Sequence, residues 1–200
     1  MLVRLYDKNP NPRELAKVTD VLNKGGIIIY PTDSVYAFGC KLTAIAGIER
    51  ITKLAGKDES MLTIICSSIS QAAEYARIDN AQFKVLKRNT PGPFTFILNA
   101  SSSISDRVLA KRKTVGIRIP DSTIAQAIIE DVGMPLFTTS VKDPDSIVEY
   151  TTDPDLIWER YSHKVDALVS ADYGQDIPTT IVDLTDGEPE IVRQGIGELR

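Results

Sequence analysis

Residues 26–40 read GIIIYPTDSVYAFGC, and this stretch decides the fold. The first five residues are a short apolar run, which is typical of a buried strand. Pro31 ends the hydrogen-bonded ladder because it has no amide hydrogen, and Thr32, Asp33 and Ser34 follow at the carboxyl end of the strand. In open α/β sheets, ligands bind outside the carboxyl ends of the strands. The stretch therefore predicts a buried strand that carries polar side chains to a binding site.

Amphipathic helical segments and short apolar runs alternate on either side of this stretch. In residues 12–24, for example, Leu15, Val18 and Leu22 recur at helical spacing. The alternation predicts an α/β fold with a twisted, mixed, partly parallel sheet covered by helices, closed by an antiparallel pair that turns at Asp186–Gly187. We predict helices at 12–24, 44–57, 69–77, 79–89, 122–133 and 155–161. We predict strands at 2–6, 26–30, 61–66, 91–100, 115–120, 134–140, 178–184 and 189–195, a strand with its turn at 165–174, and a polar, turn-rich segment over 140–155.

The composition is that of an ordinary globular chain. With 200 residues, 42% of them hydrophobic and 25% charged, the sequence predicts a single domain over residues 1–200. No apolar stretch approaches the roughly 20 residues that a membrane helix needs, and the first residues lack the apolar core of a signal peptide. We therefore expect a cytoplasmic protein with no membrane partner. Cys40 and Cys66 are too few for a disulfide framework and are expected to be buried free thiols.

The net charge of -4 is distributed unevenly along the chain. Residues 84–118 contain 8 Lys and Arg against 1 acidic residue, whereas residues 119–200 contain 5 against 17. Two interpretations stay open: a solvated face whose ion-pair partners lie in the acidic third, or a face that binds anions. The basic residues of the segment are Lys84, Lys87, Arg88, Arg107, Lys111, Arg112, Lys113 and Arg118.

The polar residues near the predicted strand ends share a chemical character. They supply two cations, several short hydroxyl groups and one carboxylate, which suits the binding of a phosphate or carboxylate. The only histidine, His163, lies far from them in sequence, and there is no glycine-rich phosphate loop. A structural interpretation is also open, in which the hydroxyls cap turns and the arginine pairs with an acidic neighbour across the sheet. These residues are Thr32, Asp33, Ser34, Lys57, Arg118, Thr138, Thr139 and Ser140.

Seven segments, in order, resemble the motifs of the YrdC family, also called the threonylcarbamoyl-AMP synthase family. The first, IYPTDSVYAFGC, is similar to the family's opening signature, and the match then covers nearly the whole chain. The second segment, LAGKDESMLTIIC, is more similar to the YciO branch than to the YrdC branch. The segments lie at 29–40, 54–66, 90–98, 115–120, 135–142, 178–184 and 191–197.

The resemblance implies a fold and an activity. The fold is YrdC-like, with helices and a twisted mixed sheet around a deep, positively lined cavity. Family synthases join L-threonine, bicarbonate and ATP into threonylcarbamoyl-AMP and release pyrophosphate, with Mg²⁺ carried by the ATP. A partner complex then transfers the threonylcarbamoyl group to adenosine 37 of tRNAs that read codons starting with A.

The resemblance also implies roles for individual residues. Two cations would reduce the repulsion between the carbamate and the α-phosphate, while threonine and serine hydroxyls would position the substrate and the nucleotide. By this carry-over Lys57 and Arg118 are catalytic, Thr32 and Ser34 bind the threonine or carbamate, and Thr138, Ser140, Thr180 and Arg193 bind the nucleotide.

Two positions depart from the family pattern. Synthases carry Lys-x-Arg and Ser-x-Asn where this chain has Lys57-Asp58-Glu59 and Ser140-Val141-Lys142. Because the two changes have opposite charges, we predict that Glu59 and Lys142 form an ion pair at the cavity mouth. The cavity is then expected either to make the adenylate with altered contacts, or to bind or hydrolyse it without making it.

A third function needs no catalysis, because YrdC-like domains are also described as binding double-stranded RNA and tRNA. The residues expected to bind RNA phosphates are Lys84, Lys87, Arg88, Lys111, Arg112 and Lys113.

Overall fold

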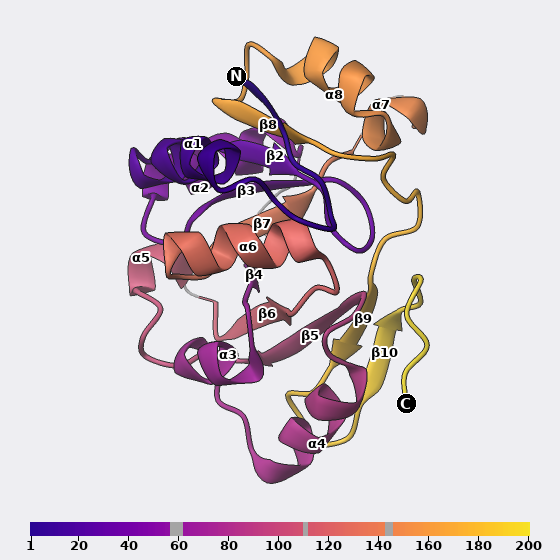
Figure 1. Ribbon diagram of the computed structural model, residues 1–200. Helices are drawn as coiled ribbons and strands as arrows, with labels where there is room; N and C mark the ends of the chain where they lie inside the picture. Colours follow the sequence, from indigo (N-terminus) through magenta and orange to yellow (C-terminus); the bar gives the residue numbers. More distant parts are fainter. Residues whose placement is uncertain (57–61, 110–111, 143–145) are drawn as a thin grey trace.

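The strands of the computed structural model form one mixed sheet within its described residues, 1–56, 62–109, 112–142 and 146–200 (Figure 1). Four neighbouring pairs are parallel, β1/β8, β2/β8, β4/β6 and β5/β9, and the others are antiparallel. This confirms the predicted mixed α/β fold. In spatial order the strands are β1 (Leu2–Arg4), β8 (Ala167–Ser170), β2 (Ile28–Tyr30), β3 (Ala37–Lys41), β7 (Leu136–Ser140), β4 (Thr63–Ile65), β6 (Thr114–Arg118), β5 (Phe94–Asn99), β9 (Thr180–Asp183) and β10 (Glu190–Arg193).

Local capping signals fix the helix ends. The first helix begins with Asn11, whose side chain accepts a hydrogen bond from the Arg13 amide, and with Pro12 in the first turn. The sixth ends at Gly133, which takes a left-handed conformation with φ 72°. None of the described helices is long and apolar enough to cross a membrane. The helices are α1 (Pro12–Asn23), α2 (Ile45–Leu54), α3 (Ile69–Tyr75), α4 (Asn80–Asn89), α5 (Asp106–Leu109), α6 (Thr123–Val132), α7 (Glu149–Thr152) and α8 (Pro154–Tyr161).

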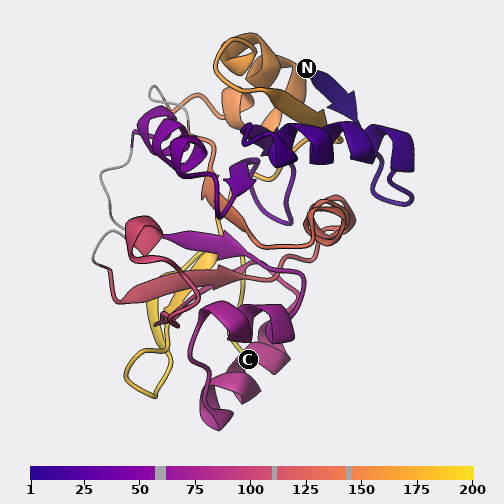
Figure 2. The ribbon, with the colours of Figure 1, turned by 90° about the vertical axis from the view of Figure 1, so that its left-hand side faces the viewer.

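Two hydrophobic cores pack on opposite faces of the sheet, because successive side chains of a strand point to opposite sides. On one face, core residues of α2, α8, α3, α4 and α5 pack against side chains such as Phe38 and Ile117. On the other face, α1 and α6 cover side chains such as Tyr30 and Leu136. Figure 2 shows α1 and α6 beside the upper strands, with α3 and α4 below. Among the described residues, the core that α1 and α6 cover therefore takes strand side chains from β1, β8, β2, β3, β7 and β4, and none from β6, β5, β9 or β10.

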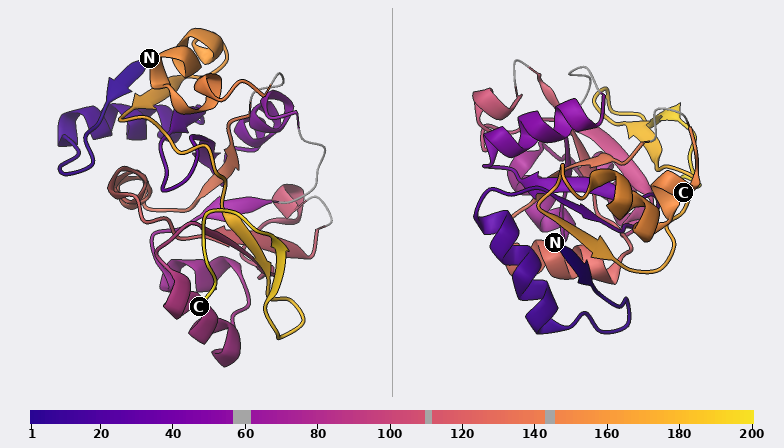
Figure 3. Two further views of the ribbon diagram at one scale, coloured as in Figure 1. Left: turned by 90° about the vertical axis from the view of Figure 1, so that its right-hand side faces the viewer. Right: turned by 90° about the horizontal axis from the view of Figure 1, so that it is seen from above.

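The hairpin β9–β10 forms the edge of the sheet farthest from β1, and Figure 3 shows the long connection from β8 that reaches it. The two strands are antiparallel and turn at Gly187, with φ 96°, as the sequence predicted. Three elements were not predicted: β3 lies between the predicted strand 26–30 and the predicted helix 44–57, α7 lies inside residues 140–155, and α5 is a short helix before β6. Residues 140–155, predicted to be polar and rich in turns, thus also contain a four-residue helix. Cys40 and Cys66 are buried and free, as expected.

Candidate functional site

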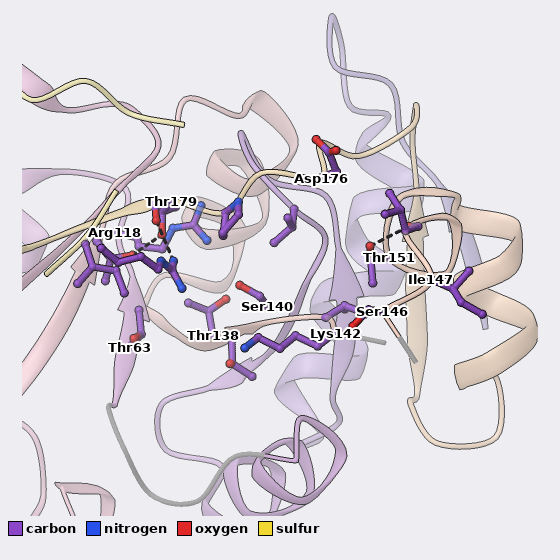
Figure 4. Close-up of a pocket in the computed structure, with 18 residues that line it drawn as sticks. Thr63, Arg118, Thr138, Ser140, Lys142, Ser146, Ile147, Thr151, Asp176 and Thr179 are labelled. Carbon is purple, nitrogen blue, oxygen red and sulfur yellow. Dashed lines mark hydrogen bonds between the residues drawn. The ribbon is translucent and has the colours of Figure 1, made fainter. Parts of the chain in front are cut away.

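A cavity of about 320 Å³ lies over the strands that run in spatial order from β7 to β10, beside the core that α1 and α6 cover. Its floor comes from one register row, in which Thr95 of β5 faces Ile181 of β9 and Ile181 faces Arg193 of β10. Further polar side chains come from β7, β4 and β6, so six neighbouring strands contribute to one space (Figure 4). From these strands the lining residues are Thr138, Thr139, Ser140, Thr63, Arg118, Thr95, Ile181 and Arg193.

Arg118 is the most buried cation of this lining, with only 4% of its surface exposed. Its Nη2 donates to Asp33 Oδ1 at 2.9 Å and to Ser34 Oγ at 3.1 Å, and more weakly to Thr32 Oγ1 at 3.4 Å. The second carboxylate oxygen of Asp33 accepts the Asp121 amide at 2.9 Å. The buried Nε of Arg118 has no hydrogen-bond partner among the described residues. Arg118 is thus oriented by the PTDS stretch, and its buried Nε donor stays unused.

Thr32 and Ser34 form a turn as well as holding Arg118. Thr32 Oγ1 donates to the Val35 carbonyl at 2.8 Å and accepts the Ser34 amide at 3.2 Å. Neither residue belongs to the lining of the cavity. The structural and the functional interpretation of these residues therefore both apply, because the residues cap a turn and also support the arginine of the cavity. Their predicted substrate-binding role stays a prediction.

A second guanidinium, that of Arg193, faces the same space from β10. Burial and the positive charge of Arg118 both lower the pKa of Arg193 from its ordinary value. Its Nη2 donates to the Thr179 carbonyl at 2.8 Å, and the hydroxyl groups of Thr179 and Thr95 hydrogen-bond to each other at 2.9 Å. Two cations that repel each other in a polar cavity form a natural site for an anion.

The hydroxyl of Thr138 is fixed by partners on two neighbouring strands. It donates to the Phe38 carbonyl at 3.1 Å, so the hydroxyl of Tyr30, 2.9 Å away, donates to Thr138. Burial raises the pKa of Tyr30 to about 12, which keeps this phenol protonated at neutral pH. The Tyr30 ring crosses β3 at Gly39, where an added Cβ would lie 2.7 Å from the ring. Thr138 therefore offers the cavity a lone pair, because its only proton is already donated.

The structure places Thr180 away from the lining and its neighbour Thr179 within it. Thr180 is fully buried, its hydroxyl donates to the Gly197 carbonyl at 2.6 Å, and it accepts the Gly195 amide at 2.9 Å. Sequence reasoning missed Thr179, Thr95 and Thr63. The sequence did contain a signal for Thr179. Side chains alternate between the two faces of a strand, so if Thr180 faces the core, its neighbour Thr179 faces the opposite side.

The Sua5/YciO/YrdC family model, described as "Telomere recombination", matches residues 20–195. The chain belongs to this family. The protein named YciO in Escherichia coli (strain K12) is 39% identical over 199 residues, which are 98% of this chain and 96% of that protein. The family resemblance and the preference for the YciO branch are therefore confirmed at the level of sequence.

Solved structures of family members share the fold. The crystal structure of E. coli YciO has a TM-score of 0.93 and 39% identity, with 99% of this chain and 97% of that chain covered. P. abyssi Sua5, solved in complex with L-threonine, has a TM-score of 0.86 and covers all of this chain. Because it is only 22% identical and 62% of the Sua5 chain is covered, this likeness shows the fold alone.

The remaining predicted site residues fall into two groups. Lys57, Glu59 and Lys111 lie outside the described residues, and so does the ion pair predicted between Glu59 and Lys142. The other predicted RNA-binding residues are described, and none of them lines the cavity. Lys84, Lys87 and Arg88 are exposed on α4, whereas Arg112 and Lys113 precede β6, at the opposite end of that strand from Arg118.

Proposed function

We propose that the cavity binds ATP and L-threonine and, with bicarbonate, makes threonylcarbamoyl-AMP. The observation that carries this proposal is the pair of guanidinium groups, Arg118 and Arg193, that face one polar cavity. Family membership supports the reaction class, and P. abyssi Sua5 has been solved in complex with L-threonine.

In the proposed reaction, the amine of L-threonine first combines with bicarbonate, with loss of water, to give a carbamate. A carbamate oxygen then attacks the α-phosphorus of ATP, and the bond from that phosphorus to pyrophosphate breaks, so that pyrophosphate leaves with the electron pair. Two anions must approach each other in this step, and Arg118 and Arg193 reduce their repulsion without moving a proton. Mg²⁺ enters with ATP as part of the substrate.

The remaining predicted residues take roles that follow from their contacts. Thr32 and Ser34 act through Arg118, which they orient. Ser140 lines the cavity and supplies a hydroxyl to the nucleotide phosphate. Thr138 accepts a hydrogen bond from the ligand, because its proton is donated to the Phe38 carbonyl. By family resemblance Lys57 shares the neutralisation of charge with Arg118. The predicted contribution of Thr180 is indirect, through the backbone it holds.

The deciding experiment incubates the purified protein with ATP, L-threonine and bicarbonate and analyses the products by mass spectrometry. We expect the threonylcarbamoyl adduct and pyrophosphate, strongly reduced in Arg193→Gln and unchanged in Lys8→Gln, an exposed lysine outside the cavity lining. AMP without the adduct would instead support a cavity that hydrolyses the adenylate. If folded protein gives neither product, both forms of the proposal are wrong.

A second candidate function is the binding of double-stranded RNA or tRNA by α4. The three exposed cations Lys84, Lys87 and Arg88 are spaced i, i+3 and i+4, so they share one face of this helix. Such a face can contact phosphates without reading sequence. A tRNA, or the protein that modifies it, is accordingly the proposed macromolecular partner.

A further inference from the structure

Lys142 combines an anchored main chain with an ammonium group that has no partner among the described residues. The amide of Val141, a buried residue, donates to the Tyr36 carbonyl at 2.8 Å, and the Tyr161 hydroxyl donates to the Lys142 carbonyl at 3.2 Å. Within the part of the chain that the structure describes, no residue forms a hydrogen bond or an ion pair with the Lys142 ammonium group. The backbone is therefore fixed just beyond β7 while the charge stays available.

The side chain of Lys142 extends into the cavity. It lines the same space as Thr138 and Ser140, and Figure 4 shows it entering from the end of β7, on the side opposite Arg118. The guanidinium of Arg118 is already bonded to Asp33, and that of Arg193 to the Thr179 carbonyl. Lys142 thus adds a third positive charge from a different element of the wall.

The three positive charges of the cavity indicate how much negative charge a ligand should carry and how that charge should be spaced. A single carboxylate or monophosphate can be bound by the two guanidinium groups. A cation on the other side of the cavity gains from a ligand only if that ligand carries further negative charge at a distance from the first. Among the described lining residues, Asp176 is the only carboxylate, and no ion pair joins it to Lys142. A chain of phosphates fits this demand, and the ammonium group suits it as a compact charge with three donors.

We propose that Lys142 is a specificity-determining residue that binds the terminal phosphates of a nucleoside triphosphate, so that the cavity prefers ATP to AMP. This inference rests on the proposed function. It differs from that function in naming which described side chain distinguishes a triphosphate from a monophosphate. The other source of a second anionic group is the carboxylate of the amino-acid substrate, and the experiment separates the two.

The test measures the affinities of ATP, AMP, inorganic pyrophosphate and L-threonine by titration calorimetry. The variants are Lys142→Gln, which removes the charge, Lys142→Arg, which keeps it, and the surface control Lys8→Gln. We expect Lys142→Gln to weaken ATP and pyrophosphate about tenfold, the size of a missing hydrogen bond to a charged group, and to leave AMP and L-threonine within about twofold. Lys142→Arg and Lys8→Gln should bind all four ligands nearly as the natural protein does.

Three results would overturn the inference. Equal weakening of ATP and AMP would mean that Lys142 does not distinguish the terminal phosphates. Weakening of L-threonine alone would assign Lys142 to the carboxylate. In both cases the proposed function would stand, because the natural protein would still bind the substrates. If the natural protein binds none of the four ligands, the proposed function fails together with this inference.

Discussion

Arg118 and the basic face of α4 belong to the same basic stretch of sequence, residues 84–118, yet their burial and their position relative to the cavity differ. Arg118 is 4% exposed and bonded to Asp33, Ser34 and Thr32, inside a cavity wall. The α4 face, formed by Lys84, Lys87 and Arg88, is exposed to solvent and lies outside the cavity lining. Density of charge along the sequence therefore does not locate a site. The site is located by which charges the fold brings to the cavity.

The sheet topology explains how the stretch is divided. Between the α4 face and Arg118 the chain forms β5, α5 and β6. Even Lys113 and Arg118, five residues apart, lie at opposite ends of β6, about 16 Å apart for an extended strand. The segment with the strongest positive charge thus supplies one cation to the cavity. The other two described cations of the lining come from later in the chain, Lys142 just beyond β7 and Arg193 on β10.

The largest effect should follow from breaking the buried ion pair. Arg118→Met leaves the Asp33 carboxylate buried without its cation, and we expect the free energy of unfolding to fall by about 3–5 kcal/mol. The matched surface change, Arg88→Met on α4, should alter it by less than about 0.5 kcal/mol. Urea unfolding monitored by circular dichroism measures both. Adding Asp33→Leu to Arg118→Met should restore part of the stability, and a single variant as stable as the natural protein would show that the pair is not structural.

Replacing Arg193 should reduce the affinity for ATP strongly and the free energy of unfolding only slightly. Its side chain contributes one hydrogen bond to the Thr179 carbonyl and is less buried than Arg118, so Arg193→Gln should cost less than about 1 kcal/mol of stability. Affinity for ATP should nevertheless fall about tenfold to a hundredfold, because the neutral amide of the variant lacks the positive charge and the bidentate geometry of the guanidinium. Calorimetric titration of ATP and urea unfolding on the same protein give both numbers. Arg88→Gln is the control for the removal of a guanidinium, and a large fall in stability without a fall in affinity would contradict the assignment.

Tyr30 gives a smaller effect that depends on pH. Its pKa is raised to about 12 in the folded protein, against an ordinary value of 10.0, because burial disfavours the charged phenolate. The unfolded chain therefore loses its proton first as pH rises. The stability that Tyr30 contributes is complete below pH 10 and is lost between pH 10 and 12. Between pH 8 and pH 11, Tyr30→Phe should lose about 1 kcal/mol less stability than the natural protein.

Urea unfolding at the two pH values, in a reducing buffer, tests this difference. Tyr6→Phe is the control, because the Tyr6 side chain is 61% exposed in the folded protein. Equal pH dependence of the natural protein and Tyr30→Phe would show that burial does not keep the Tyr30 phenol protonated in the folded protein.

Much of the architecture could be predicted because hydrophobic periodicity is a local signal, but β3 could not. Its residues include Ala37 and Gly39, which have weak strand propensity, and it follows a turn-forming stretch. The strand exists because β2 and β7 pair with it on both sides, and Gly39 fits because the Tyr30 ring passes over it. The four-residue helices α5 and α7 are too short to show a helical period.

The candidate site could be predicted where a polar side chain ends an apolar strand, as at Arg118, Thr138 and Ser140. The contribution of Thr179 depended on which face of the last strand pair turns toward the cavity, and that face is set by packing between distant segments. The predicted role of Thr180 shows the consequence, because an error of one residue in a strand exchanges the two faces.

The α4 face should show the smallest effect on the cavity. Replacing Lys84, Lys87 and Arg88 together by Gln should leave affinity for ATP within about twofold, since exposed charges outside the site are screened beyond a Debye length of about 8 Å.

If this face binds RNA phosphates, the slope of log K against log salt for double-stranded RNA should become shallower by about 0.9 for each phosphate that is no longer neutralised. Filter binding or fluorescence anisotropy at several salt concentrations measures the slope. The double variant Lys8→Gln, Lys24→Gln is the control, because both lysines are exposed and neither is predicted to bind RNA. An unchanged slope in the triple variant would show that the α4 face is a solvated surface that does not bind RNA. Arg118 would then be the residue of the basic stretch that still has a proposed ligand.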